Sequence, residues 1–221
     1  MNEIKLIVFD MDGTVYDMKD MAENNFEISV AYLMDHFHYS FEDAKQFLEA
    51  HQIYPYAFSG SGSSTQLFVQ MGADLRHWNE YRSALFDFDR IKKENAVRVE
   101  DLLFFKKIAP IVLLTNNTSM NTKYVLDQIK IDISIFDKVQ CNDDPRATVS
   151  KISSMKQLID EYRISPEEAL SIGDRYQIDA KPMLELGGKA IIVKDPSSFR
   201  KIISEYPKLK SCEEYSFYES M

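Results

Sequence analysis

Two carboxylates stand one residue apart near the start of the chain. The segment "IKLIVFDMDGT" begins with an apolar stretch, Ile4 to Phe9, and then reaches Asp10 and Asp12. A short apolar run rich in branched residues is typical of a buried strand. Because like charges held this close repel one another, Asp10 and Asp12 require a compensating positive charge at the end of that strand.

Polar residues of complementary chemistry follow other apolar stretches. Thr115 and Asn116 come directly after "PIVLL", Asp174 follows "ALSIG" with Asp179 about one turn further on, and Lys151 precedes a segment of helical periodicity. Clustered carboxylates are tolerated around a hard divalent cation such as Mg²⁺, which takes oxygen ligands. An ammonium group with hydroxyl and amide donors suits a dianionic group, most simply a phosphate. These residue types therefore indicate a metal site beside a phosphate site.

These residues must be brought together by the elements that carry them. The apolar stretches predict strands at Ile4–Phe9, 111–114, 138–141, 169–172 and 189–193, and helical spacing recurs between them. Strands that alternate with helices form right-handed βαβ units, so we expect an α/β fold with a Rossmann-like parallel sheet covered on both faces. Ligands of such sheets bind beyond the carboxyl ends of the strands.

The segment after the first predicted strand has a different pattern. Apolar residues recur there at helical spacing, namely at Phe26, Val30, Leu33 and Phe37 and again at Leu75, Trp78 and Leu85. No strand is expected between about Asp17 and Arg90. We therefore expect a helical cap domain at residues 17–90, inserted into an α/β core domain formed by residues 1–16 and 91–221.

Four parts of the chain resemble the four motifs of the haloacid dehalogenase-like (HAD) hydrolase superfamily, in order and in spacing. They are "FDMDGTVYD", "LLTNN", Lys151 and "SIGDRYQID". The resemblance covers the first predicted strand and the chain from roughly Arg90 to Val193. It implies the HAD fold, with the helical insertion as a C1-type cap that closes over a small substrate and excludes water.

The resemblance implies catalytic roles for five residues. Asp10 would be the nucleophile that forms an aspartyl-phosphate, and Asp12 would act first as general acid and then as general base. Thr115, the backbone amide of Asn116 and Lys151 would bind the transferring phosphoryl group, with Lys151 stabilising its charge and orienting Asp10.

The same resemblance implies a Mg²⁺ ion as cofactor. Asp10 and Asp174 would be ligands through their side chains, and Asp12 would offer its backbone carbonyl. Asp179 would be a ligand through water or a partner of the ligands. The metal would neutralise charge and align the phosphoryl oxygens.

Simpler accounts exist for some of these residues. Thr115 and Asn116 taken alone are residues that cap a helix N-terminus. Lys151 taken alone could be a surface lysine of an amphipathic helix. It is followed by isoleucine and not by the proline usual in the family, so Lys156, a turn and a half later, is the alternative lysine.

The acid at position 12 narrows the predicted activity. Dehalogenases of this superfamily lack an acid there and its transport ATPases carry threonine, so Asp12 favours a phosphatase or a phosphomutase. We expect a magnesium-dependent phosphatase that hydrolyses a small phosphate monoester. The alternatives are a phosphomutase of the β-phosphoglucomutase type and a non-catalytic protein that binds a phosphate ligand on a HAD scaffold.

Features of the cap resemble pyrimidine 5'-nucleotidase-like members, and phosphoglycolate phosphatase-like members are a second possibility. Tyr16 follows "DGTV", and the cap contains "YSFEDAKQFLEAHQIYPYAFSG". On this interpretation Tyr54, Tyr56 and Phe58 line the substrate pocket and stack on a nucleobase, although they could equally form the core of the cap. Gly13 is a departure, because several of those nucleotidases carry asparagine there.

Composition limits the partners. The 221 residues carry a net charge of -9, which argues against a nucleic-acid polymer as partner and allows a small phosphorylated metabolite. Cys141 and Cys212 have no metal-ligand spacing, so a reducing cytoplasm is the expected compartment. No signal peptide or membrane-spanning run is evident. We expect a monomer or a homodimer.

Overall fold

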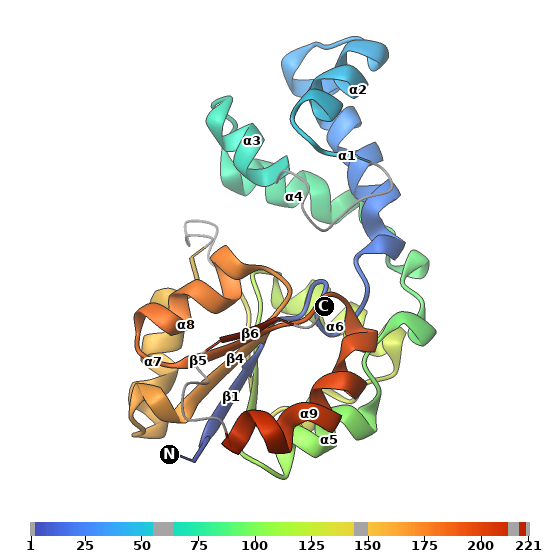
Figure 1. The fold of residues 1–221 in the computed structure, drawn as a ribbon. Coiled ribbons are helices and arrows are strands. Elements are labelled where there is room, and N and C mark those ends of the chain that lie inside the picture. Colours follow the sequence, from blue (N-terminus) through green and yellow to red (C-terminus); the bar gives the residue numbers. More distant parts are fainter. Residues whose placement is uncertain (1–2, 55–63, 144–149, 212–216, 220–221) are drawn as a thin grey trace. The chain divides into compact units, whose positions relative to one another are not determined.

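The chain divides into two compact units, which Figure 1 shows in a computed structural model that describes residues 3–54, 64–143, 150–211 and 217–219. Unit 1 consists of Met1–Asp17, Lys92–Asp143 and Thr148–Met221, and unit 2 consists mainly of Met18–Ile91. Unit 1 is the α/β part and unit 2 is a helical insertion after the first strand, so the predicted fold class is confirmed. The role of unit 2 as a cap stays a prediction.

Six parallel strands form the sheet of unit 1, in the order β3-β2-β1-β4-β5-β6. Their bounds are β1 Leu6–Phe9, β2 Ile111–Leu114, β3 Lys138–Gln140, β4 Ala169–Gly173, β5 Lys189–Ile192 and β6 Phe217–Glu219. The first five match the predicted strands to within two residues. The sequence did not predict β6, because so short a strand carries no periodicity and is defined only by its pairing with β5.

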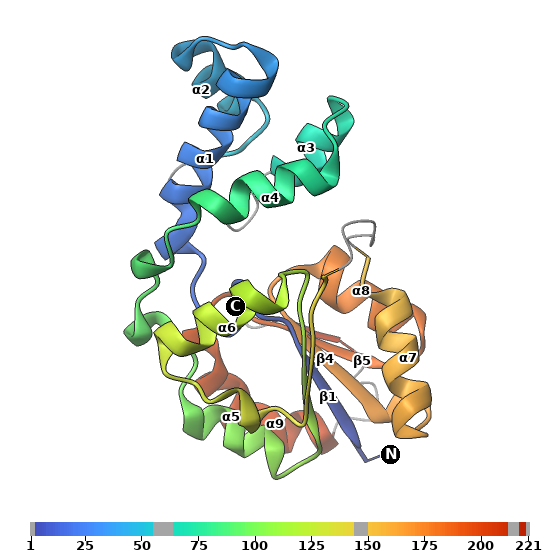
Figure 2. The same ribbon diagram turned by 180° about the vertical axis from the view of Figure 1, so that it is seen from behind.

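Helices cover both faces of this sheet, as Figures 1 and 2 show. They are α5 Val99–Lys106, α6 Ser119–Ile129, α7 Ile152–Tyr162, α8 Lys181–Glu185 and α9 Phe199–Ser211. Alternate residues of β1 face opposite ways: Val8 packs with Met155 of α7, whereas Phe9 contacts Phe105 of α5 and Phe199 of α9. This period of two is why β1 is buried on both sides.

Shorter helical turns join these elements. They are η1 Phe88–Arg90, η2 Lys93–Asn95, η3 Ile133–Ile135, η4 Pro166–Glu168, the π-helical turn η5 Tyr176–Ala180 and η6 Pro196–Ser198. Of these, η5 matters for the site because it follows β4 and carries Asp179. Ser165 precedes η4, and its backbone N–H donates to Glu168 Oε2 at 3.0 Å.

Unit 2 consists of α1 Lys19–Phe37, α2 Phe41–Ala50, α3 Ser64–Gln70, α4 Leu75–Leu85 and η1. Its core is aromatic, with Tyr32, Phe68 and Trp78 in mutual ring contact. Ser40 caps α2 by accepting from the backbone N–H of Asp43. Within its described residues the unit contains no strand. Among all the helices described, none is both long enough and apolar enough to span a bilayer.

Candidate active site

A buried lysine joins two carboxylates at the carboxyl edge of the sheet. Lys151 directly precedes α7, and its Nζ lies 2.5 Å from Asp10 Oδ1 and 2.8 Å from Asp179 Oδ1. Asp10 follows β1 and Asp179 lies in η5. The three side chains are at most 3% exposed. The chain thus brings residues 141 positions apart into one desolvated ion-pair cluster, which persists only when each charge has a partner.

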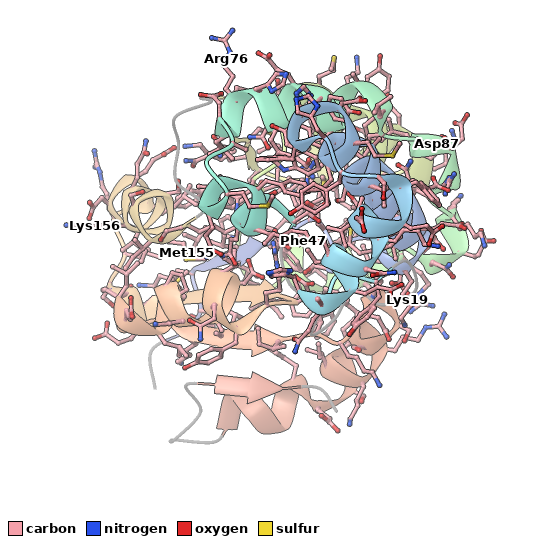
Figure 3. All side chains as sticks on the ribbon, turned by 90° about the horizontal axis from the view of Figure 1, so that it is seen from above. Lys19, Phe47, Arg76, Asp87, Met155 and Lys156 are labelled. Carbon is pink, nitrogen blue, oxygen red and sulfur yellow. The ribbon has the colours of Figure 1, made fainter. Side chains whose placement is uncertain are left out.

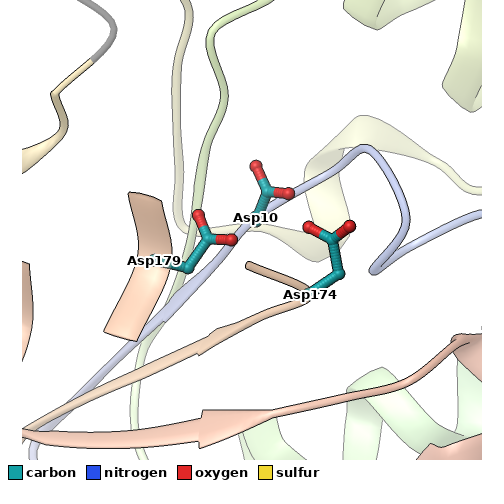
Figure 4. Close-up of side chains that lie close together, drawn as sticks. All are labelled: Asp10, Asp174 and Asp179. Atoms are coloured by element: carbon teal, nitrogen blue, oxygen red, sulfur yellow. The ribbon is translucent and has the colours of Figure 1, made fainter. Parts of the chain in front are cut away.

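A third carboxylate completes an acidic group. Asp10, Asp174 and Asp179 each offer one oxygen, and these oxygens all lie within 4.8 Å of one another. Figure 4 shows the three carboxylates gathered at the ends of β1 and β4. Among the described residues, neither Asp10 Oδ2 nor Asp174 Oδ1 has a hydrogen-bond partner, although both atoms are buried. Buried carboxylate oxygens without donors are rare in folded proteins.

The charges of this group are unbalanced. Burial, aided by the charge of Asp179, raises the pKa of Asp10 to about 6, and burial with the charge of Asp10 raises the pKa of Asp174 to about 8. Burial alone would lower the pKa of Lys151, but Asp10 and Asp179 raise it, so the ammonium stays protonated. Carboxylates that repel one another and keep oxygen atoms without hydrogen bonds among the described residues fit a divalent cation, which prefers oxygen ligands.

Two glycines allow the acidic loops to come this close. Gly13 has φ +77°, and a Cβ there would lie 2.4 Å from Asp174 Oδ2. A Cβ on Gly173 would lie 2.3 Å from the Cβ of Asp179. Neither gap leaves room for a methyl group, and at position 13 the backbone conformation also disfavours any side chain. Gly13, noted in the sequence as a departure from the nucleotidases, is therefore required by this arrangement.

The side chain of Asp12 lies outside the acidic group. Its carboxylate accepts a hydrogen bond from the Tyr16 hydroxyl, with 2.6 Å to Oδ1. The Asn117 side-chain amide donates to Oδ1 at 2.9 Å and to Oδ2 at 2.6 Å. The contribution to the metal that the family resemblance implies for Asp12 is its backbone carbonyl, and that contribution stays a prediction. Tyr16 is buried and bonded to Asp12, so its presence needs no nucleobase to account for it.

The residues after β2 are not a helix cap. Thr115 is buried, and its Oγ1 accepts the backbone N–H of Asn117 at 3.1 Å. The cap of α6 is Thr118, which accepts from the backbone N–H of Asn121 at 3.2 Å. The capping explanation of Thr115 and Asn116 is therefore wrong, because the helix begins three residues later than that explanation requires.

Of the two candidate lysines, only Lys151 lies at the carboxylates. Lys156 is exposed on α7, where Figure 3 shows it pointing outward, while the neighbouring Met155 is buried against the sheet. Tyr54 is half-buried in unit 2. Tyr56 and Phe58 lie outside the described residues. The base-stacking role predicted for these aromatic residues stays a prediction.

Three side chains of the site were not predicted. Tyr16 and Asn117 contact Asp12, and Arg175 places its Nε 3.6 Å from Asp174 Oδ1 while its backbone N–H donates to Asp179 Oδ2 at 3.0 Å. For one of them the sequence held only closeness in the chain: Tyr16 is four residues after Asp12, and a tight turn in which Gly13 has φ +77° brings the two together. Asn117 and Arg175 carry no comparable signal.

The described residues thus form a parallel sheet whose carboxyl edge carries a lysine–carboxylate cluster and three carboxylates close enough to hold a metal ion. The chain matches the family model of the haloacid dehalogenase-like hydrolases over residues 4–187 and belongs to that family. The predicted family is therefore confirmed, and with it the prediction that the chain is an enzyme of the hydrolase class.

Solved structures share the fold. The chain is similar to a predicted phosphatase from Clostridium acetobutylicum (17% identity, TM-score 0.61, covering 100% of this chain and 95% of that chain). It is also similar to a HAD phosphatase from Thermococcus onnurineus (16% identity, TM-score 0.60, covering 90% of this chain and 98% of that chain). A third similar structure is that of a putative beta-phosphoglucomutase from Thermotoga maritima (14% identity, TM-score 0.53, covering 91% of this chain and 99% of that chain). No curated protein matches the sequence.

Proposed function

We propose that the protein is a magnesium-dependent phosphatase that hydrolyses small phosphate monoesters through an aspartyl-phosphate on Asp10. The observation that carries the proposal is the buried Lys151 ammonium between Asp10 and Asp179, beside two acidic oxygens that accept no hydrogen bond from the described residues. A buried positive charge next to a carboxylate nucleophile suits the transfer of a dianionic group, because its field acts in a low dielectric.

In the first step, a carboxylate oxygen of Asp10 attacks phosphorus and the bond between phosphorus and the ester oxygen breaks. Asp12 donates its proton to the departing oxygen, which leaves as an alcohol. Lys151, the Thr115 hydroxyl and the backbone N–H of Asn116 bind the oxygens of the phosphoryl group during transfer. Lys151 and Thr115 are both buried, so these interactions exclude water.

In the second step, a water molecule attacks the phosphorus of the aspartyl-phosphate. Asp12, now ionised, takes a proton from that water, and the bond between phosphorus and the Asp10 oxygen breaks. Inorganic phosphate leaves and Asp10 is regenerated as a carboxylate. The same residue thus serves as acid and then as base, which restores the starting protonation state.

Asp10 and Asp174 with the backbone carbonyl of Asp12 would hold the Mg²⁺ ion. When bound, the ion supplies charge neutralisation to the carboxylates and the phosphoryl oxygens. Asp179 uses Oδ1 for Lys151 and Oδ2 for the backbone N–H of Arg175. Its main contribution would be to hold Lys151 in place beside Asp10.

The test is a phosphate-release screen of the purified protein over nucleoside 5'-monophosphates, sugar phosphates and phosphoglycolate. We expect turnover with Mg²⁺, loss with EDTA, recovery when Mg²⁺ is added back, and poor recovery with Ca²⁺, whose looser coordination misplaces the reacting groups. Asp10→Asn is the control and should be inactive. Nucleotide preference would support the base-stacking role of the unit 2 aromatic residues.

Three results would contradict the proposal. Turnover that needs a sugar bisphosphate and returns the phosphoryl group to the sugar would identify a phosphomutase. No turnover on any ester with Mg²⁺ present would favour the non-catalytic protein that binds a phosphate ligand. Activity that survives in Asp10→Asn would remove Asp10 as the nucleophile.

A further inference from the structure

The carboxylate of Asp12 is held by donors from two different segments. The Tyr16 hydroxyl approaches Oδ1 to 2.6 Å from the loop after β1. The Asn117 amide approaches Oδ1 to 2.9 Å and Oδ2 to 2.6 Å from the loop after β2. Tyr16 is 1% exposed and Asn117 8%, so both donors act out of water, where hydrogen bonds to a charged group are strong.

The backbone anchors both donors. Around Asp12 the chain makes a tight turn, in which the N–H of Val15 donates to the carbonyl of Met11 at 2.8 Å. The Val15 carbonyl then accepts from the N–H of Val97 at 2.8 Å, and Tyr16 forms an antiparallel bridge with Ala96. This pairing fixes the Tyr16 ring against the loop, so its hydroxyl has little freedom to leave Asp12.

The second donor is anchored on the other side. The N–H of Asn117 donates to Thr115 Oγ1 at 3.1 Å, and its carbonyl accepts from the N–H of Asn142 at 2.9 Å. Two loops of unit 1, each anchored by a further segment, thus determine where the Asp12 carboxylate points. Such support is what a group needs when it must transfer a proton along one defined direction.

We propose that Tyr16 and Asn117 are positioning residues that hold Asp12 in the orientation for proton transfer to the leaving group. This inference rests on the proposed phosphatase function. Among the described residues, Oδ1 accepts two hydrogen bonds and Oδ2 accepts one, from Asn117. Oδ2 therefore keeps a lone pair and is the oxygen that releases the proton in the first step and receives it from water in the second.

The contacts on Oδ1 suit both steps. When Oδ2 carries the proton, Oδ1 is a carbonyl-type acceptor and both of its donors can stay in place. Only the contact between Asn117 and Oδ2 must loosen in that state. Tyr16 and Asn117 thus keep the Asp12 carboxyl group oriented while its proton leaves and returns.

The test compares two esters with different leaving groups. An alkyl phosphate needs a proton on its departing oxygen, whereas p-nitrophenyl phosphate departs as a stable phenolate and needs little help. In Tyr16→Phe we expect kcat/KM to fall about 10–100-fold on the alkyl phosphate and less than about threefold on p-nitrophenyl phosphate, since acid catalysis contributes about 10²–10⁴-fold in enzymes. The kcat/KM value depends only on the steps up to and including the first phosphoryl transfer, which is the step that needs the proton of Asp12.

Tyr81→Phe is the matched control. The Tyr81 hydroxyl also donates to an aspartate, Asp35, at 2.6 Å, but in unit 2. We expect no difference between the two esters in that variant. Asn117→Ala removes the other donor and should repeat the Tyr16→Phe pattern, which keeps the inference testable should Tyr16→Phe fail to fold by circular dichroism.

Each outcome has one meaning. An equal loss on both esters in the folded variants, or no loss on either, overturns the positioning role and leaves the proposed function standing. A wild-type protein inactive on both esters overturns the proposed function and this inference with it. A selective loss on the alkyl phosphate is the result that a merely structural hydrogen bond would not produce.

Discussion

The helical unit fills its centre with aromatic rings, whereas the α/β unit places buried charges at the ends of its two central strands. In unit 2 the Trp78 ring lies 4.8 Å from Tyr32 and 4.7 Å from Phe68, and its Nε1 donates to Thr65 at 2.9 Å. In unit 1 Asp10 is almost fully buried, yet its Oδ2 has no donor among the described residues.

The ion pairs of the two units differ in burial: those of unit 2 are exposed to solvent and those of Lys151 in unit 1 are buried. Arg90 in unit 2 contacts Glu23, Glu27 and Asp87, all of which are exposed to solvent. Such pairs contribute little because water screens them. The pairs of Lys151 are desolvated and leave negative charge in excess. Unit 2 thus keeps its charges in water and packs aromatic rings at its centre, which favours stability. Unit 1 buries an excess of negative charge at its sheet edge, which costs stability, as functional sites often do.

Asp10→Asn should give the largest change in activity. Removing the nucleophile should lower turnover by about 10⁴-fold or more, since each member of a catalytic unit is needed for the whole. The same change should leave the melting temperature of the metal-free protein unchanged or higher, because it removes one repelling charge. Phosphate release and circular dichroism measure the two effects, and a large loss of stability would contradict the comparison.

Lys151→Met should lower both the stability and the activity of the protein. It leaves Asp10 and Asp179 buried without their cation, which costs about 3–5 kcal/mol for a buried pair, and it should lower kcat at least about 10²-fold. Lys138→Met is the matched control, because Lys138 is 2.5 Å from Glu161 in a solvent-exposed pair. That variant should lose about 1 kcal/mol or less in urea unfolding. Equal losses in the two variants would refute the difference between the pairs.

Gly13→Ala should act through metal binding. The new Cβ would meet Asp174 Oδ2 at 2.4 Å, in a backbone conformation that alanine disfavours. We expect the Mg²⁺ concentration for half-maximal activity to rise about tenfold or more, with a cost of about 1–2 kcal/mol in stability. Gly72→Ala is the control for backbone strain alone, since Gly72 has φ +91° and, apart from its chain neighbours, no atom of the described residues lies within 4 Å of the added Cβ. Unchanged metal affinity in Gly13→Ala would contradict this account.

The stability of the metal-free protein should depend on pH in a defined direction. The folded-state pKa values of Asp10 and Asp174, about 6 and about 8, lie above the ordinary value of 3.8. Raised values mean that the folded protein binds protons more tightly than the unfolded chain. The stability that these groups add below about pH 4 is therefore lost as the pH rises toward 8, by up to about 1.4 kcal/mol per pH unit for each group.

Mg²⁺ should reverse this loss, because it replaces the missing positive charge and binds only the folded chain. Thermal melts at pH 5 and pH 8, with and without Mg²⁺, measure the effect, and stabilisation by Mg²⁺ should be larger at pH 8. Asp174→Asn should flatten the profile above pH 6. A metal-free protein whose stability rises over this range would contradict the assigned direction.

Arg90→Met in unit 2 should give the smallest effect. Its three carboxylate partners are exposed, so the charges lost are already screened by water. We expect kcat/KM within about twofold of wild type and a stability loss well below that of Lys151→Met. Sensitivity of the Arg90→Met melting temperature to salt should also be lower than that of the wild type. A loss as large as that of Lys151→Met would remove the contrast between the units.

Much of the fold followed from periodicity. The strands β1, β2, β4 and β5 are continuous apolar runs, and such runs between helical segments specify a parallel sheet whatever their partners are. The limits of α4 followed from apolar spacing as well. The edge strand β6 did not follow, because its three residues become a strand only through hydrogen bonds to β5, a non-local interaction without a local signal.

Much of the site followed from position. Asp10, Thr115 and Asp174 were expected at the sheet edge because each follows a predicted strand, and the parallel sheet brings those ends together. The choice between Lys151 and Lys156 did not follow, since both lie at or near the start of one helix. Only packing decides it: Met155 and Leu158 turn α7 so that Lys151 enters the site and Lys156 faces solvent.

The sequence by itself determined the family, the α/β class and the main residue types of the site, because the succession of strands and helices along the chain and the motif residues are local features of a sequence. The tertiary structure alone decided which side chains touch. It directed Asp12 toward Tyr16 and Asn117, left Asp10 Oδ2 and Asp174 Oδ1 without hydrogen-bond donors from the part of the chain that is described, and required glycine at position 13. The reason is physical: hydrogen bonds and desolvation depend on distances of a few ångströms between segments remote in the chain, and local patterns do not encode those distances.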